Sequence, residues 1–403
     1  MKFSTDGIRT THGGNLPRPA YLDELLQPGP VVSAEAAERL PEAVQYVVDR
    51  QLGAGLSVVN DGEYVKAAGG GSYAGYIHRR VTGWEVLPVD PARPPKRAGV
   101  GARDRELFPG FYASGLWLQG SGGPVRPGFF TPGAVPPEPV VERVCTGPVS
   151  YTGQAAVKAD IDALNKALAG RDDSVEGFVA ALGPLSLGAG ARNEHYSSEE
   201  EYMTAVAECV RGEYRAIAAS GLIVQIDEPE FATAWQFHPD WDTARYRRFL
   251  GWCVEIINHA LAGIPPEQIR FHVCWGSGHR PHVTDIPLAD IADLLLKINA
   301  QAYSVEAGNV RHAHEWRVWE DVRLPEGRIL VPGVVSHATD LVEHPELVAE
   351  RLVNYASVVG RENVQGGTDC GIGSRVGHEE IVWAKLGALA KGAELATERL
   401  RGR

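Results

Sequence analysis

The sequence predicts an α/β protein with a single domain, built as a (β/α)8 or TIM barrel. Short apolar stretches alternate with longer amphipathic or Ala- and Glu-rich segments, which is typical of parallel strands joined by helices. Eight such stretches fit within the 403 residues of the chain. Polar candidate residues follow most of these stretches, as they do at the carboxyl rim of a barrel.

The strands and helices are expected in regular alternation. The expected strands cover residues 56–60, 144–150, 178–183, 222–227, 269–275, 302–306, 329–335 and 364–368. Ser33 is a suitable N-cap for the first long helix, because its side-chain oxygen can accept a hydrogen bond from the first turn. The expected helices cover residues 34–52, 157–168, 198–220, 243–262, 288–298, 345–359 and 379–400.

Residues 65–140 interrupt this alternation after the first expected strand. The segment is rich in Gly and Pro but also carries many aromatic residues, which favours an ordered insertion over a flexible linker. One hypothesis is a lid over the barrel mouth. The alternative is a small structural element or a contact in a homo-oligomer. No separate second domain is expected, so residues 1–403 form one domain.

Composition excludes several classes of partner. The formal net charge of −12 argues against nucleic acid and anionic membrane surfaces, both of which favour basic faces. No apolar run is long enough to span a bilayer, and the N-terminus lacks the apolar segment of a signal peptide. Five widely spaced cysteines do not indicate a disulfide framework. A cytoplasmic protein with free thiols is expected.

His272-Val273-Cys274 is the most informative motif of the chain. On a strand, side chains two residues apart share a face, so an imidazole and a thiol would point the same way. Cys370 and Glu306 follow or end two other expected strands. A nitrogen, two sulfurs and a carboxylate make a zinc-type ligand set. The alternative for each cysteine alone is a small buried hydrophobic residue.

Several motifs together resemble the catalytic C-terminal barrel of the cobalamin-independent methionine synthase family. The resemblance spans nearly the whole chain. It is carried by T-T-H-G-G-N-L-P-R-P at 10–19, D-G-E at 61–63, T-G-P-V at 146–149, I-D-E-P at 226–229, H-V-C at 272–274, Glu306 and D-C-G at 369–371.

This resemblance implies a zinc site and a reaction. His272, Cys274, Glu306 and Cys370 would bind one Zn²⁺ ion. The implied function is the transfer of a methyl or other alkyl group to a thiol, with the zinc-bound thiolate attacking carbon. Only a thiolate is a good nucleophile, and coordination deprotonates a thiol. Glu306 is the weakest donor to this metal and is expected to yield to the substrate sulfur.

The resemblance also implies residues around the substrate. Glu63 and Asp227 match positions that bind the amino group of homocysteine, although a structural salt bridge is an alternative for either residue. Gly14 and Asn15 lie where the family holds the homocysteine carboxylate, but Asn15 departs from the family's serine. His337 lies near the family's proton-donating histidine.

The thiol and the alkyl donor stay open. Full-length methionine synthases of this class have two barrels, whereas this chain holds one. Its N-terminal T-T-H and L-P-R-P also resemble epoxyalkane:coenzyme M transferase, which opens an epoxide with a zinc-bound thiolate. A lyase that breaks a C–S or C–O bond would use the same zinc site. A non-catalytic zinc- or thiol-binding barrel is the alternative from another class.

Overall fold

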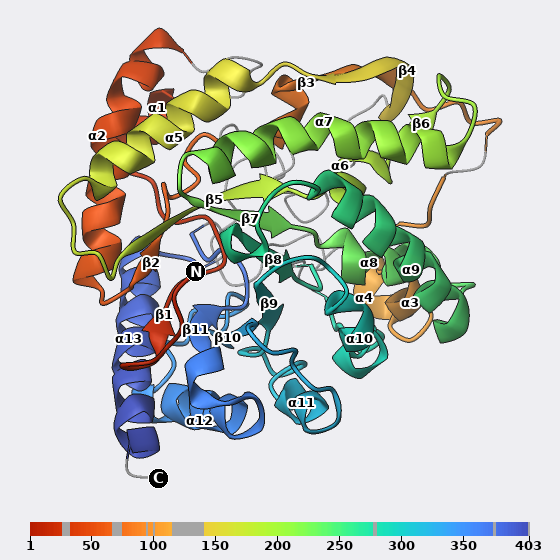
Figure 1. The fold of residues 1–403 in the computed structure, drawn as a ribbon. Helices are drawn as coiled ribbons and strands as arrows, with labels where there is room; N and C mark the ends of the chain where they lie inside the picture. The colour runs from red at the N-terminus through yellow and green to blue at the C-terminus, as the bar shows by residue number, and fades with distance from the viewer. Residues whose placement is uncertain are drawn as a thin grey trace.

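Eight parallel strands form the centre of the protein (Figure 1). The structure is a computed structural model that describes residues 1–25, 33–66, 75–93, 96–99, 101–114, 141–276, 280–373 and 376–401. In the sheet, the strands lie in the order β1-β11-β10-β9-β8-β7-β5-β2. They are β1 (Arg9–Thr10), β2 (Val58–Val59), β5 (Glu176–Leu182), β7 (Ile223–Asp227), β8 (Ile269–Val273), β9 (Ala302–Glu306), β10 (Ile329–Val335) and β11 (Gln365–Thr368).

Ser57 closes this sheet into a barrel. Its backbone N–H donates to Thr10 O at 3.0 Å, and its Oγ accepts from Thr10 N at 3.0 Å. Its carbonyl accepts from Glu176 N at 3.0 Å, so β1 is connected to β5 through the start of β2. The predicted TIM barrel is therefore confirmed.

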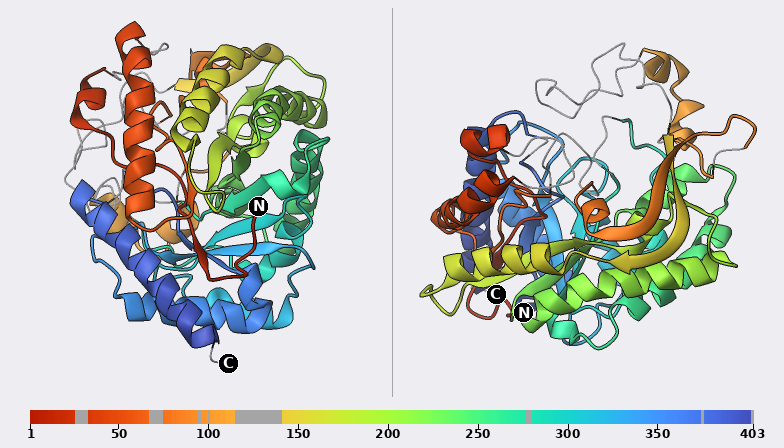
Figure 2. Two further views of the ribbon diagram at one scale, coloured as in Figure 1. Left: turned by 60° about the vertical axis from the view of Figure 1, so that its left-hand side comes forward. Right: turned by 90° about the horizontal axis from the view of Figure 1, so that it is seen from above.

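Helices surround the barrel, as the two views of Figure 2 show. Ser33 caps α2 through a hydrogen bond from Ala36 N, as expected. The long helix α13 packs against α12. The helices are α1 (Ala20–Leu25), α2 (Ala34–Gly53), α5 (Gln154–Leu168), α6 (Pro184–Gly188), α7 (Glu199–Ala219), α8 (Glu230–Phe237), α9 (Thr243–Ala260), α10 (Ala292–Leu295), α11 (Val318–Asp321), α12 (Pro345–Val359) and α13 (Glu379–Arg401).

Short 3-10 turns complete this layer. They are η3 (Ile77–Arg79), η5 (Pro266–Gln268), η6 (Leu288–Asp290), η7 (Glu315–Arg317) and η8 (Arg361–Asn363). The helix predicted over 288–298 is shorter than expected. Only η6 and the four-residue α10 form there, joined by hydrogen bonds of the 3-10 type such as Ile291 N to Leu288 O.

One predicted barrel strand is wrong. The stretch at 144–150 lies in β4 (Val141–Tyr151), which pairs with β3 (Val81–Pro88) and β6 (Arg192–Asn193) in a separate three-stranded sheet. Most residues of β4 are partly or fully exposed, whereas β7 to β10 are buried throughout. The barrel strand that was missed is β1, whose two residues are too short for a periodic signal.

The insertion therefore follows the second barrel strand, not the first. Its described part contains η3, β3, α3 (Ala102–Arg105) and α4 (Pro109–Ala113). Arg103 of α3 donates hydrogen bonds to three backbone carbonyls that follow or end α8, which attaches this part to the barrel. Residues 67–74, 94–95, 100 and 115–140 of the predicted insertion lie outside the described residues. The lid hypothesis stays a prediction.

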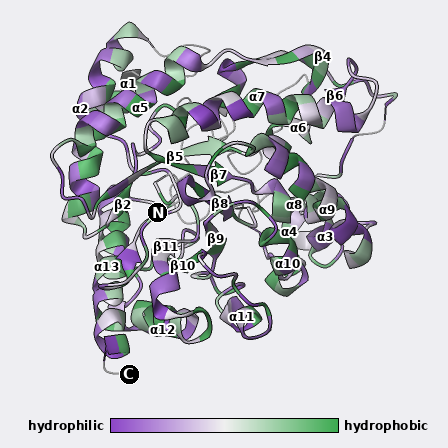
Figure 3. Ribbon diagram, in the orientation of Figure 1, coloured by the Kyte–Doolittle hydropathy of each residue, from purple (hydrophilic) through white to green (hydrophobic). Residues whose placement is uncertain are grey.

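The core has two layers, one between barrel and helices and one inside the barrel. In Figure 3, helices such as α2 and α13 carry both hydrophobic and hydrophilic residues, as expected for helices with one face on the barrel. Small apolar clusters with Met1 and Phe3 fill the amino end of the barrel interior. Arg270 fills the next level, over the Phe178 ring at 3.9 Å, with a hydrogen bond of 2.8 Å to Thr11 Oγ1.

None of the helices in the described part of the chain combines the length and the apolar character that crossing a membrane requires.

Two glycine substitutions are expected to have opposite effects, because Gly333 lies at a close backbone contact between β10 and β11 whereas Gly387 does not. A Cβ at Gly333 would lie 2.4 Å from Asp369 Cα, so Gly333→Ala forces the backbones apart and is expected to cost about 1–3 kcal/mol. Gly387 lies in α13, and an added Cβ there would have no described atom within 4 Å apart from its chain neighbours and the backbone of its own helix. Gly387→Ala is expected to stabilise by up to about 1 kcal/mol. Urea unfolding midpoints check both, and shifts of the same sign would contradict the argument.

Candidate metal centre

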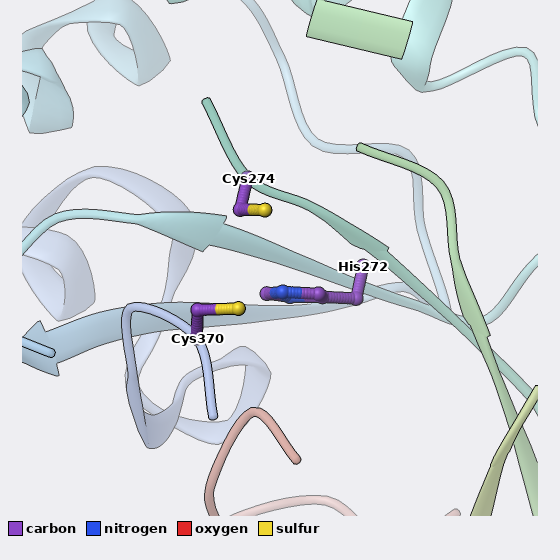
Figure 4. A group of neighbouring side chains, drawn as sticks. All are labelled: His272, Cys274 and Cys370. Atoms are coloured by element: carbon purple, nitrogen blue, oxygen red, sulfur yellow. The ribbon is translucent and has the colours of Figure 1, made fainter. Parts of the chain in front are cut away.

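Three predicted metal ligands converge at the carboxyl end of the barrel. Strand β8 carries His272, and Cys274 follows it on the same face because strand side chains alternate. Cys370 follows β11, which is separated from β8 by β9 and β10. The ligand atoms of the three residues all lie within 4.8 Å of one another, and Figure 4 shows the side chains pointing toward a common centre.

The orientation of His272 leaves one ring nitrogen directed into this centre. Its Nδ1 lies 3.0 Å from Ser304 Oγ of β9, a contact that fixes the ring plane. Its Nε2 is buried and has no hydrogen-bond partner within the described residues. Buried polar atoms are normally satisfied, so an orphaned imidazole nitrogen beside two sulfurs fits a cation.

The electrostatics of the site also fit a cation. Contact with Cys370 and burial raise the pKa of the Cys274 thiol well above its ordinary value. Burial and the charge of Asp369 raise the pKa of Glu306 in the same direction. A buried group of acids that repel one another is stabilised by a divalent cation, which favours their ionised forms. One nitrogen and two sulfurs suit Zn²⁺.

Glu306 lies at the end of β9, buried beside these ligands but outside the three-residue group. Its Oε1 accepts a hydrogen bond of 2.8 Å from Trp275 N, and its Oε2 accepts one of 2.7 Å from Asn309 Nδ2. Its charge contributes to the raised pKa of Cys274, so the two side chains are close. Its role as a fourth ligand stays a prediction.

Glu63 and Asp227 form a second acidic group that adjoins the predicted metal ligands. Glu63 lies in the turn after β2 with a φ of 56°, an unusual conformation for this residue type. Its Oε1 is buried without a hydrogen-bond partner in the described part of the chain. Burial raises its pKa, and the charges of Asp227 and Cys370 add to the effect, whereas the charge of Lys66 opposes it. Asp227 ends β7 and accepts from Gln225 Nε2 at 2.7 Å.

The segment containing Gly14 and Asn15 joins the two acidic groups. A Cβ at Gly14 would lie 2.9 Å from Glu63 Oε1, and one at Gly13 would lie 2.7 Å from Cys370 Cα. Asn15 O accepts a hydrogen bond of 2.9 Å from Gly373 N, in the loop after Cys370. The structure thus places both predicted substrate-binding residues at the barrel mouth. Their contact with substrate stays a prediction.

His337 follows β10 and is buried near the same centre. Its Nδ1 lies 3.8 Å from Asp369 Oδ2. The Oδ1 atom of Asp369 accepts hydrogen bonds of 2.7 Å from Ala307 N and from Gly308 N. Burial raises the pKa of Asp369 to about 6. His337 therefore contacts Asp369, the residue directly before Cys370. Its role as proton donor stays a prediction.

Sequence reasoning missed a buried polar network behind Gly14. His12 Nδ1 accepts from Gly14 N at 3.3 Å, and its Nε2 contacts Gln51 Oε1 at 2.8 Å, which fixes the proton on Nε2. Gln51 Nε2 donates to Asn60 O at 2.8 Å, and Asn60 Nδ2 donates to Gly14 O at 3.3 Å. Both backbone groups of Gly14 are therefore held. The T-T-H motif was a signal, but its partners lie on α2 and directly after β2.

This network predicts acid sensitivity. Burial lowers the pKa of His12 from 6.5 to about 3. As pH falls below 6.5 the unfolded chain binds a proton that the folded protein excludes, so stability falls with pH. From about pH 7.5 to about pH 5 the loss from this residue is roughly 2 kcal/mol. In urea unfolding at both pH values, His12→Gln is expected to lose that part of the pH dependence. An unchanged dependence would contradict the assignment.

Two known proteins are similar to this chain in sequence. Methionine synthase of Thermococcus kodakarensis is 26% identical over 225 residues, which are 55% of this chain and 58% of that protein. The 2-hydroxypropyl-CoM lyase of Xanthobacter autotrophicus is 25% identical over 232 residues, which are 51% of this chain and 57% of the lyase. The chain therefore matches less than two thirds of the length of either relative.

A solved structure shows that the fold is shared. The B12-independent methionine synthase from Shewanella sp. W3-18-1, in complex with selenomethionine, has a TM-score of 0.68 with this chain. The superposition covers 98% of this chain and 100% of that chain, at 22% sequence identity.

The family profile covers most of the chain. Residues 138–394 match the family described as "Cobalamin-independent synthase, Catalytic domain". The matched range contains the three converging ligands, Glu306, Asp227 and His337. The resemblance inferred from the motifs is confirmed: the chain belongs to the family of cobalamin-independent synthase catalytic domains.

Proposed function

We propose that this protein catalyses the zinc-dependent transfer of a methyl or other alkyl group to a thiol. The observation that carries the proposal is the convergence of His272, Cys274 and Cys370 at the barrel mouth, with His272 Nε2 directed into their centre. Family membership and the similarity to a methionine synthase support the same class of reaction.

The residues present would hold the metal and leave room for a substrate. His272, Cys274 and Cys370 would be permanent ligands, with Glu306 as the exchangeable fourth. Zinc bound there would supply a thiolate nucleophile at neutral pH, by lowering the pKa of the substrate thiol. His272, Cys274 and Glu306 are buried, which strengthens their electrostatic interactions.

The second acidic group indicates the kind of thiol. Glu63 has a buried carboxylate oxygen without a partner among the described residues, and Asp227 lies close to it. An ammonium group would satisfy that oxygen and offset the repulsion between the two carboxylates. The acceptor we propose is therefore an aminothiol such as homocysteine. His337 would donate the proton to the leaving group of the alkyl donor.

A second candidate is a thiol transferase that opens an epoxide, or a lyase that breaks a C–S or C–O bond. The similarity to 2-hydroxypropyl-CoM lyase favours it, as does Asn15 at a position where the family has serine. The same thiolate state would lie on both paths. A thiol with an anionic substituent, however, would meet Glu63 and Asp227 unfavourably.

One experiment separates these functions. Zinc-loaded protein is incubated with homocysteine or with 2-mercaptoethanesulfonate, each with a methyl donor or a short epoxide, and the products are identified by mass spectrometry. Methylated or alkylated homocysteine supports the proposal. Products from 2-mercaptoethanesulfonate, or cleavage of its thioethers without added thiol, support the second candidate. Thiol binding without any turnover supports a non-catalytic barrel, and absence of zinc binding overturns the proposal.

A further inference from the structure

The carboxylate of Glu306 occupies a binding site of its own. Both of its oxygens accept a hydrogen bond, Oε1 from Trp275 N at 2.8 Å and Oε2 from Asn309 Nδ2 at 2.7 Å. Trp275 directly follows the ligand Cys274, so this site is adjacent to the metal centre. Glu306 is thus held beside the three converging ligands without being one of their group.

The side chain of Asn309 has only one orientation that satisfies its neighbours. Its Oδ1 accepts hydrogen bonds from Arg311 N at 3.0 Å and from His312 N at 3.2 Å, which caps the turn after β9. Its Nδ2 therefore faces Glu306 Oε2 and, at 3.2 Å, Asp369 Oδ2. Rotation of the amide would place an oxygen against two carboxylates and an NH2 group against two N–H donors, which is unfavourable.

A buried imidazole supports the same site from behind. His312 Nδ1 lies 2.7 Å from Glu315 Oε2, its Nε2 lies 3.5 Å from Asp285 Oδ2, and its ring packs on the Trp275 indole at 4.4 Å. Burial opposes its charge, but the contacts with Asp285 and Glu315 outweigh burial and raise its pKa to about 10. The charge of His312 lowers the pKa of Glu306 and so opposes the larger effects of burial and Asp369 on this carboxylate.

We propose that Asn309 is a positioning residue that holds Glu306 in a released position, which opens a coordination position for the substrate thiol. The inference rests on the proposed function. Away from the metal, Glu306 would keep its hydrogen bonds from Trp275 N and Asn309 Nδ2, and the imidazolium of His312 would offset part of its charge. A thiol could then take its place on zinc without leaving a buried, unsatisfied anion.

Removing the Asn309 Nδ2 donor should change the affinity for zinc and the affinity for the thiol in opposite directions. In the thiol-free protein, Glu306 either binds zinc or stays on Asn309. Loss of the Nδ2 donor weakens the second state, so zinc should bind more tightly. The thiol must displace Glu306 from zinc, so the thiol should bind less tightly. A charge-assisted hydrogen bond of about 1.5–3 kcal/mol corresponds to roughly 10- to 100-fold in each affinity.

Asn309→Ser is the variant that tests this. Its hydroxyl can still accept hydrogen bonds from the turn, but the Nδ2 donor is lost. Zinc affinity is measured by competition with a chelator in the absence of thiol. Homocysteine affinity is measured from the visible spectrum of the Co²⁺-substituted protein. Arg311→Ala is the matched control, because it removes contacts of the same loop to His282 O and Val283 O without touching Glu306.

The expected result is a roughly 10-fold gain in zinc affinity together with a roughly 10-fold loss in homocysteine affinity, and neither change in Arg311→Ala. In a Glu306→Gln background, Asn309→Ser should have little further effect, because Asn309 acts through Glu306. Parallel losses of both affinities, or no change in either, overturn the inference. A wild-type protein that binds zinc but no thiol overturns the proposed function instead. In that case the zinc affinities of the wild type and of Asn309→Ser still decide the role of Asn309.

Discussion

Cys370→Ser is expected to weaken zinc binding by more than about 100-fold and to abolish thiol alkylation. Substitution of a residue that only supports a metal ligand typically weakens metal binding by about 10- to 100-fold, and loss of a ligand should cost more. A serine hydroxyl is neither deprotonated at neutral pH nor a soft donor, so one of the three converging ligands is lost. Cys370 follows β11, whereas His272 lies on β8 and Cys274 follows that strand, so the remaining pair cannot close the site. Metal content after dialysis against a weak chelator is the measurement.

Cys145→Ser is the matched control for that substitution. Cys145 is a buried cysteine that forms no disulfide, and it lies in β4, outside the barrel sheet, with its thiol 3.4 Å from Gly147 O. This variant should keep zinc and activity. Retention of stoichiometric zinc by Cys370→Ser, with normal activity, would show that the metal centre is elsewhere or absent.

The parts of the site that the sequence predicted are those governed by strand periodicity. His272 and Cys274 share a face because they are two residues apart on a strand, and the barrel rim brings Cys370 to them because parallel strands end at one edge. Glu63, Asp227 and His337 were placed at the mouth for the same reason. None of the five cysteines forms a disulfide bond in the structure.

The parts that could not be predicted depend on contacts between distant segments. Strand β1 has two residues, so no pattern marks it, whereas β4 has a strand composition and belongs to another sheet. The partner of His12 is Gln51 on α2, and nothing in the local sequence pairs them. The orientation of Glu306 is set by Asn309, whose own orientation follows from a turn. Strand periodicity carries no information about such side-chain choices.

Glu63→Gln should remove the preference for a thiol that carries an ammonium group. The comparison uses homocysteine and 4-mercaptobutanoate, which lacks only the amino group. A charge-assisted hydrogen bond to a buried carboxylate is worth about 1.5–3 kcal/mol, so the wild type should favour homocysteine roughly 10- to 100-fold in kcat/KM. In Glu63→Gln the value for homocysteine should fall by that factor, while the value for 4-mercaptobutanoate should change little.

The pH dependence of binding gives an independent check on this role. Burial raises the pKa of Glu63 well above its ordinary value, and the charges of Asp227 and Asp61 add to the effect against the opposing charge of Lys66, so the free protein holds a proton there beyond the usual range. An ammonium favours the ionised carboxylate, so homocysteine binding should release that proton and strengthen as pH rises. Glu63→Gln has no proton to release and should lose this dependence. Equal losses for both thiols, with the pH dependence unchanged, would instead show that Glu63 maintains the turn after β2.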